Sequence, residues 1–265
     1  MTQRTVERLP GSYTRPPGST PRPTERGSLV LARAVWIAAI FLALVGAASG
    51  IARAVFVDDL VTRVEPMRTR ILAAADRPDP FASRRAAELE VVDGRFANNR
   101  MTTLVHVVGG SLFLLLAPFQ FSRRIRGTYL AFHRWSGRFL VATGILMAIA
   151  GLYFGLFMPY GGLGEALAIS GAGGLFLFAI VRAFLAIRQK DIARHRVWMT
   201  RAFGVGIGIT VVRFAAGLFD FWLTPQGFTP ATIFVFSLWT GFGLSVTVTE
   251  LWFAHTRRNE QSFAG

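Results

Sequence analysis

The chain has 265 residues and contains no cysteine, and Lys190 is its only lysine among 29 basic residues. Without thiols it can form no disulfide, hold no cysteine-ligated iron–sulfur cluster and attach no c-type haem covalently. Any metal or haem would need histidine, methionine or carboxylate ligands, and the sequence has four histidines. Charged residues are scarce at 17%, whereas hydrophobic residues reach 52%.

The hydrophobic residues gather in runs of about 20, the length that crosses a hydrocarbon core of ~30 Å as a helix. Because backbone groups facing lipid must be hydrogen-bonded within their own segment, we predict an all-α polytopic membrane protein with a six-helix transmembrane bundle. The predicted spans are about 29–52, 101–122, 138–158, 165–187, 198–222 and 231–254.

The net charge of +14 is placed at the ends of these runs. This is the pattern that orients membrane proteins, so we expect a lipid bilayer and anionic lipids at its inner face as partners, and no nucleic acid. The connection 122–138 carries five arginines and no acid, which predicts a cytoplasmic location. Both termini are then cytoplasmic, in the plasma (inner) membrane of a bacterium.

Three regions follow from this topology. Residues 1–28 are rich in proline and arginine and predict a disordered basic cytoplasmic tail. Residues 29–256 form the transmembrane domain, with an outer loop at about 53–100 that balances its charges and contains a short helix over 83–92. Residues 257–265 form a second cytoplasmic tail. The sequence leaves open a membrane-protein partner or a homo-oligomer.

Two stretches resemble each other in layout and predict a parallel repeat of the second and third helices in the fourth and fifth. His106-Val-Val-Gly-Gly precedes an apolar run, as does Ser170-Gly-Ala-Gly-Gly, and each leads to a basic connection and a His-Arg pair. The repeat would make His133 and His195 equivalent. The alternative is that glycine pairs and Leu/Phe runs recur by composition alone.

His133 and His195 begin two helices at one depth, so they could ligate a b-type haem, with nearby arginines such as Arg201 pairing with its propionates. The alternative is that interfacial His-Arg pairs contact lipid headgroups or cap helices. His106 and Arg213 lie nearer the outer face, in the second and fifth spans, and could bind a quinone headgroup or an anionic substrate, or form a structural charge network. Gln120 and Glu250 could complete a polar cluster with the two histidines, or Glu250 could instead form an interfacial pair with Arg257 or a loop arginine.

Several motifs in residues 101–221 resemble an uncharacterised bacterial family of multi-pass membrane proteins. The matching residues are His106 with Gly110, Pro118 with Gln120, His133-Arg134 with Gly137-Arg138, and His195-Arg196 with Trp198, Met199 and Arg201; Arg213 also fits. The resemblance implies a membrane location and a shared polar constellation, and it implies no activity.

Two functional hypotheses follow. In the first, the chain is a redox or quinone-linked membrane protein with one haem b between His133 and His195. In the second, it is a non-enzymatic membrane protein, either a small-solute transporter or an assembly partner of a membrane complex, with a polar cavity near His106 and Arg213. Whether the chain is an enzyme stays open between them.

Overall fold

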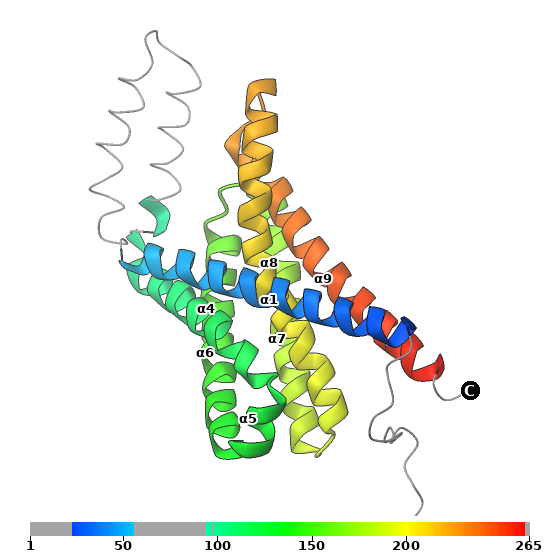
Figure 1. Cartoon of the computed structure of the whole chain (residues 1–265). Helices are drawn as coiled ribbons and strands as arrows, with labels where there is room; N and C mark the ends of the chain where they lie inside the picture. Colours follow the sequence, from blue (N-terminus) through cyan, green and yellow to red (C-terminus); the bar gives the residue numbers. More distant parts are fainter. Residues whose placement is uncertain (1–22, 56–93, 97, 263–265) are drawn as a thin grey trace, which may run out of the picture.

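The computed structural model describes residues 23–55, 94–96 and 98–262 (Figure 1). The predicted helix over 83–92 and most of the predicted N-terminal tail lie outside these residues. Within them every regular element is a helix. The helices are α1 (Pro23–Val55), α4 (Arg100–Gln120), α5 (Arg123–Thr128), α6 (Leu130–Phe157), α7 (Gly162–Arg188), α8 (Ile192–Leu223), the 3-10 turn η1 (Thr224–Gln226) and α9 (Pro230–Ser262).

Six of the described helices are long and apolar enough to cross a membrane. They coincide with the six predicted spans, so the predicted all-α, six-span class is confirmed. Their ends differ from the prediction where polar residues extend a helix. The helix α6 begins at Leu130 and α8 at Ile192, several residues before the apolar runs that predicted them. An apolar run measures the hydrocarbon thickness, whereas helix formation continues through arginines, which have good helix propensity.

Four helices, α4, α6, α7 and α8, form a ring in which each packs against two others. The contacts run α4–α6, α6–α7, α7–α8 and α8–α4, which leaves α6 and α8 on a diagonal. The helix α9 packs against α8 and α7, and α1 crosses the bundle obliquely to contact α4 and α8 (Figure 1). A ring of this kind directs side chains from facing helices into one interior, where four-helix bundles build their ligand sites.

Aromatic side chains fill the centre of the four-helix ring. Phe113 of α4 and Phe176 of α7 are buried and meet edge to face, with ring centroids 5.2 Å apart. Leu140 and Ile180 complete this layer, each about 1% exposed. The middle of the bundle is therefore closed by packed side chains, and any ligand must enter towards one end.

Small residues allow α1 and α9 to pack closely against α8. A Cβ atom placed on Gly46 would collide with Oγ1 of Thr210, and one on Gly241 would lie 2.5 Å from the backbone nitrogen of Val212. Gly46 and Gly50 are four residues apart on α1, and Gly50 faces Ser111 of α4. This spacing of small residues lets membrane helices approach closely. Close packing between helices accounts for the glycines at these positions.

The helix bundle has two ends. The α5 end comprises α5, the turn 189–191, the first turns of α6 and α8, and residues 250–256 of α9. The opposite end comprises residues 94–96 and 98–99, the turn 158–161 and the turn 224–229. Each end carries its own polar contacts, and the two sets share no residue.

Candidate functional site

His133 and His195 occupy the same position in the two diagonal helices. Leu130 and Ile192 begin α6 and α8, so each histidine is the fourth residue of its helix. Each histidine also donates its backbone N–H to the residue before its helix, Tyr129 or Asp191, at 3.0 Å. The repeat that the sequence predicts stays a prediction. Each imidazole lies on the first turn of its helix, at the α5 end.

The ring of His195 is oriented by the neighbouring helix α7. Its Nδ1 lies 2.9 Å from the carbonyl oxygen of Ala183, a residue with no exposed surface. A carbonyl only accepts hydrogen bonds, so Nδ1 carries the proton and Nε2 holds the lone pair. This is the orientation that metal-ligating histidines commonly have, with one nitrogen held by a backbone carbonyl and the other able to bind.

His133 differs from His195 in the surroundings of its Nδ1 atom. Its Nδ1 is buried and has no hydrogen-bond partner among the described residues. A buried polar atom without a partner costs about 1–3 kcal/mol, so such atoms often mark a ligand or a water position. The charges that act on this imidazole come from Arg126, His195, Arg134 and Arg196, all of them basic.

The short helix α5 brings arginines to the same place. Its first turn is capped by Ser122, whose hydroxyl accepts from the Ile125 backbone N–H at 3.4 Å. Arg126 is half-buried, and burial, followed by the charges of Arg196 and Arg123, lowers its pKa below the usual arginine value. Desolvation and like charges both disfavour the charged form of the Arg126 guanidinium.

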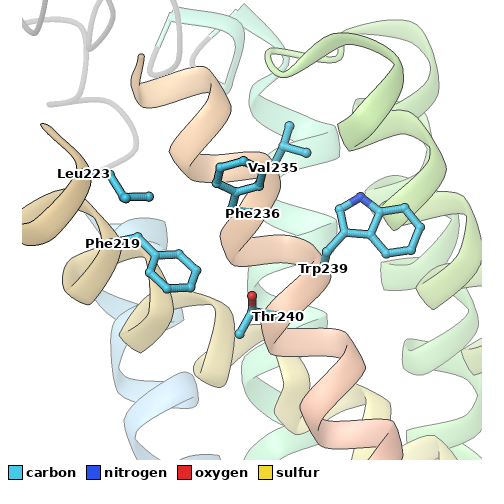
Figure 2. A pocket seen from close by; sticks show the side chains of 6 residues that line it. All are labelled: Phe219, Leu223, Val235, Phe236, Trp239 and Thr240. Carbon is cyan, nitrogen blue, oxygen red and sulfur yellow. The ribbon is translucent and has the colours of Figure 1, made fainter. Parts of the chain in front are cut away.

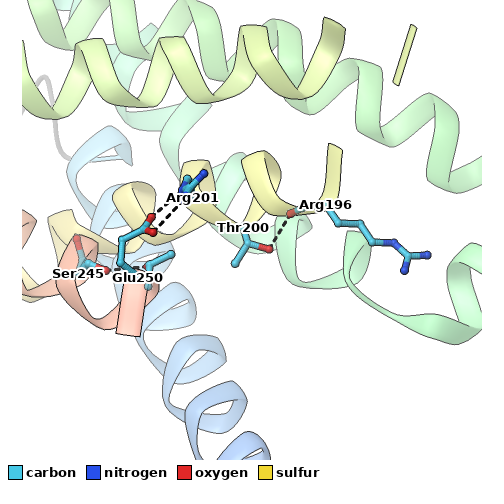
Figure 3. A network of polar contacts seen from close by, with 6 residues as sticks. Arg196, Thr200, Arg201, Ser245 and Glu250 are labelled. Atoms are coloured by element: carbon cyan, nitrogen blue, oxygen red, sulfur yellow. Dashed lines mark hydrogen bonds and ion pairs between the residues drawn. The ribbon is translucent and has the colours of Figure 1, made fainter. Parts of the chain in front are cut away.

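Arg201 is engaged by an ion pair with Glu250. Its Nε and Nη2 donate to the two carboxylate oxygens of Glu250 at 2.6 and 2.9 Å, joining α8 to α9 (Figure 3). Its guanidinium also lies 4.6 Å from the Trp198 ring, and Arg182 of α7 lies 5.6 Å from the same ring. The stretch from His195 to Arg201 therefore ties together the α5 ends of three helices.

Gln120 ends α4 beside the start of α6. Its amide nitrogen donates to the Ser136 hydroxyl at 2.8 Å, and a Cβ on Gly137 would lie 3.4 Å from its amide oxygen. Gln120 is 8% exposed, so its hydrogen bond satisfies a buried amide. The sequence-predicted cluster of Gln120 with the histidines stays a prediction, since its described partner is Ser136.

His106 lies on the face of α4 that packs against α6. Its Nδ1 is 2.8 Å from the carbonyl oxygen of Met147, and a Cβ on Gly151 would lie 2.8 Å from its Cε1. Gly151 therefore leaves the space in which the imidazole packs. Arg213 of α8 acts electrostatically on His106 and donates a hydrogen bond to Ser49 of α1. Both groups predicted to line a polar cavity have protein partners.

The opposite end contains an ion pair that the sequence analysis missed. Nη1 of Arg95 lies 3.3 Å from Glu165 Oε1 and donates to the Met158 carbonyl at 2.6 Å. Glu165 is 1% exposed, and its second oxygen accepts from the Gly161 backbone N–H at 2.7 Å. A carboxylate in the first turn of an apolar span was the available signal, but its partner lies 70 residues earlier in the sequence.

An apolar groove between α8 and α9 lies towards the opposite end (Figure 2). It has a volume of about 630 Å³ and is open on one side. Its lining residues are Phe219, Leu223, Val235, Phe236, Trp239 and Thr240. No histidine or arginine borders it, so it is separate from the imidazole pair.

Comparison with known proteins places the chain in a family. No curated protein and no solved structure matches it. Residues 103–253 match the model of a family described as "Predicted membrane protein (DUF2306)", a domain of unknown function. The match covers α6, α7 and α8 completely and α4 from residue 103, and it reaches into α9, beyond the motifs that suggested the resemblance. With more than half of its length covered, the chain belongs to the DUF2306 family of membrane proteins.

Proposed function

We propose that this membrane protein is redox-active or quinone-linked and holds one b-type haem between His133 and His195 at the α5 end. The observation that carries the proposal is that the buried Nδ1 of His133 has no hydrogen-bond partner among the described residues, while the ring of His195 on the diagonal helix is already oriented. Two neutral imidazoles are a donor set that suits haem iron.

The residues around the pair support the same reading. Arg134 acts electrostatically on His133 and is exposed, so it can pair with a propionate. Arg201, also predicted from the sequence to serve there, is engaged by Glu250, so we assign the propionate to Arg134 instead. Bound haem would supply one-electron chemistry, and the chain would orient its ligands and exclude water from it.

The chain has four histidines, and we propose that two of them, His133 and His195, hold a single haem. His106 sits on α4 with its Nδ1 beside the Met147 carbonyl, and its ring packs against Gly151. We also propose that the α5 end faces the cytoplasm of a bacterial plasma membrane, with both termini on that side. The concentration of arginine at this end favours that orientation.

The test is an absorption spectrum of the detergent-purified protein, oxidised and dithionite-reduced, after expression with ample haem. We expect a Soret band and sharp reduced α and β bands, lost or converted to a high-spin form in His133→Ala and His195→Ala. His106→Ala and His255→Ala are matched controls and should keep the wild-type spectrum. A featureless spectrum of folded wild-type protein contradicts the proposal, as does an unchanged spectrum in either of the first two variants.

The second candidate is a non-enzymatic membrane protein, a transporter or an assembly partner, that uses His106 and Arg213. The observation in its favour is that Arg213 places a guanidinium beside α1, away from the ends of the bundle. Its support is weaker because Ser49 and Met147 already contact the two groups. A ligand that stabilises wild-type protein but neither His106→Ala nor Arg213→Ala would favour this candidate.

A further inference from the structure

We propose that the opposite end of the bundle binds a lipid-soluble quinone, with the ring in a polar pocket and the tail in the apolar groove between α8 and α9. The polar pocket has a volume of about 250 Å³ and is lined by Tyr160, Gly161, Ala231, Thr232 and Val235. The apolar groove, of about 630 Å³, is also lined by Val235. The two hollows therefore adjoin at one side chain, and one molecule can occupy both.

The two hollows follow each other along α9 in the order that a bilayer requires. Thr232 of the polar pocket lies in the first turn of α9, which begins at Pro230. Thr240 of the apolar groove lies further along the same helix, about 12 Å from Thr232 at ~1.5 Å per residue. The polar pocket is thus at the end of the bundle, and the groove extends from it towards the hydrocarbon. Amphipathic rings take this position at the edge of a membrane.

Two residues of the polar pocket carry hydroxyl groups, Tyr160 and Thr232. The Thr232 side chain is positioned by Thr229, because the two hydroxyl oxygens lie 2.9 Å apart and the Thr232 backbone N–H donates to Thr229 Oγ1 at 3.2 Å. The Tyr160 ring packs against Phe234, with ring centroids 6.2 Å apart. Hydroxyls donate hydrogen bonds, and the two carbonyl oxygens of a quinone accept them.

The wall behind the polar pocket carries paired charges. Gly161, which lines the pocket, donates its backbone N–H to Glu165 Oε2 at 2.7 Å. Glu165 is 1% exposed and lies 3.3 Å from Arg95, whose guanidinium is 5.8 Å from the Tyr160 ring. Because these two charges neutralise each other, the pair favours an uncharged head over a phosphate, whose charge would be costly to bury here.

The apolar groove suits the tail of such a molecule. Figure 2 shows its lining side chains, with Phe219 and Leu223 on α8 facing Phe236 and Trp239 on α9. The Trp239 indole N–H donates to the Gly164 carbonyl of α7 at 3.2 Å, so its polar atom is engaged and the ring serves as an apolar wall. The volume lies within the ~300–1,000 Å³ of small-molecule sites. The open side of the groove lets a tail enter from the bilayer.

This inference rests on the quinone-linked part of the proposed function, but it uses neither haem ligand. His133 and His195 lie at the α5 end, away from the polar pocket. His133→Ala should therefore leave the response to quinone unchanged, and Thr232→Val should leave the haem spectrum unchanged. A wild type with a haem spectrum and no response to quinone overturns this inference alone.

The experiment measures thermal unfolding of the full chain in one detergent, because a ligand that binds the folded state raises the melting temperature. Three probes are compared. Decylubiquinone is the quinone, 1-decanol supplies a tail of the same length without the quinone ring, and dimyristoylphosphatidylcholine is the phospholipid. Circular dichroism of each variant without any probe checks that its helix content matches the wild type.

The variants come in matched pairs on α9. Thr232→Val removes a hydroxyl from the polar pocket, and Thr256→Val makes the same change at the α5 end, where the hydroxyl donates to the Trp252 carbonyl at 3.0 Å. Thr240→Trp fills the apolar groove, and Val248→Trp adds a tryptophan at an exposed position outside it. Each control therefore repeats the chemistry of the change without touching either hollow.

We expect decylubiquinone to raise the melting temperature of wild type, Thr256→Val and Val248→Trp. In Thr232→Val the concentration for half-maximal stabilisation should rise about threefold to tenfold, because one neutral hydrogen bond is lost. Tyr160→Phe, which removes the other hydroxyl, should shift it in the same direction. Thr240→Trp should lose the stabilisation, because the tail no longer has space. If Thr240→Trp loses helix content, the two hydroxyl variants decide the result.

Three results would overturn the proposal. The first is a wild type that decylubiquinone does not stabilise, or that 1-decanol stabilises equally. The second is stabilisation by dimyristoylphosphatidylcholine that Thr232→Val and Thr240→Trp weaken, because the two hollows would then hold a phospholipid. The third is a response to quinone that Thr256→Val or Val248→Trp weakens as much as its partner variant, because the effect would then not depend on these hollows.

Discussion

Arg201 and Glu250 form a two-bond ion pair, with the guanidinium of α8 meeting both carboxylate oxygens of α9 at 2.6 and 2.9 Å (Figure 3). The two residues are 49 positions apart in the sequence. Phe253 lies 5.3 Å from the same guanidinium, so the pair is set between aromatic rings. The ion pair links α9 to the four-helix ring, which carries the two histidines.

Removing either member of this ion pair should lower the free energy of unfolding, because each substitution breaks the same interaction. We expect Arg201→Gln and Glu250→Gln each to destabilise, and the double variant to lose less than their sum. The coupling should be about 1.5 kcal/mol, at the lower end for charged hydrogen bonds because Glu250 is 44% exposed. Unfolding by denaturing detergent measures all three, and additive losses would show that the pair contributes nothing.

The buried pair at the opposite end should matter more. Glu165→Gln leaves Arg95 charged and without its partner, where the two side chains are 9% and 1% exposed. Breaking a buried pair costs about 3–5 kcal/mol. Arg95→Met with Glu165→Gln removes both charges and should recover part of this loss. The same unfolding measurement tests it, and Glu165→Gln should also unfold more easily than Glu250→Gln. Equal losses at both ends would contradict the difference in burial.

Two glycine substitutions of identical chemistry should have opposite signs. A Cβ on Gly46 meets Thr210 and Leu114 Cδ1, whereas one on Gly217 of α8 meets nothing within 4 Å. Gly46→Ala should therefore cost about 1–3 kcal/mol through overpacking. Gly217→Ala should be neutral or stabilise by up to ~1 kcal/mol from helix propensity. Melting temperatures in one detergent provide the comparison. An unchanged melting temperature in Gly46→Ala would mean that α1 does not pack closely at Gly46.

His106 should prove to be a packing residue. His106→Ala removes the hydrogen bond to Met147 and leaves a space opposite Gly151, so it should cost about 1–3 kcal/mol. Gly151→Ala should destabilise for the complementary reason, because its Cβ enters the space of the imidazole. Both variants should retain any haem spectrum of the wild type. Loss of the spectrum in His106→Ala at full folding would instead make His106 a ligand.

Much of the fold is predictable from local patterns. Six apolar runs predict six helices because a membrane demands one length and one backbone geometry. The basic segments predict which residues share an end, and His133 and His195 duly share one. The helix ends were less predictable, since α6 continues through the polar residues from Leu130.

The partners of the polar residues were not predictable in the same way. Arg201 carries the motif but pairs with Glu250, and Arg95 lies outside every motif but holds Glu165. Each partner is chosen by the rotation of a helix about its axis and by which helices become neighbours. Neither quantity is encoded by hydropathy, because lipid-facing and protein-facing apolar side chains are chemically alike.

The sequence alone determined the class of this protein: a cysteine-free, arginine-rich chain crossing a membrane six times, with two His-Arg pairs at one end. Those properties depend on composition and on residues close in sequence. The tertiary structure decided which charges are neutralised and which are left. It paired Arg201 with Glu250 and oriented His195 on Ala183, while His133 Nδ1 was left without a described partner. Such outcomes depend on contacts between helices far apart in the chain, where a difference of one helical turn changes every neighbour.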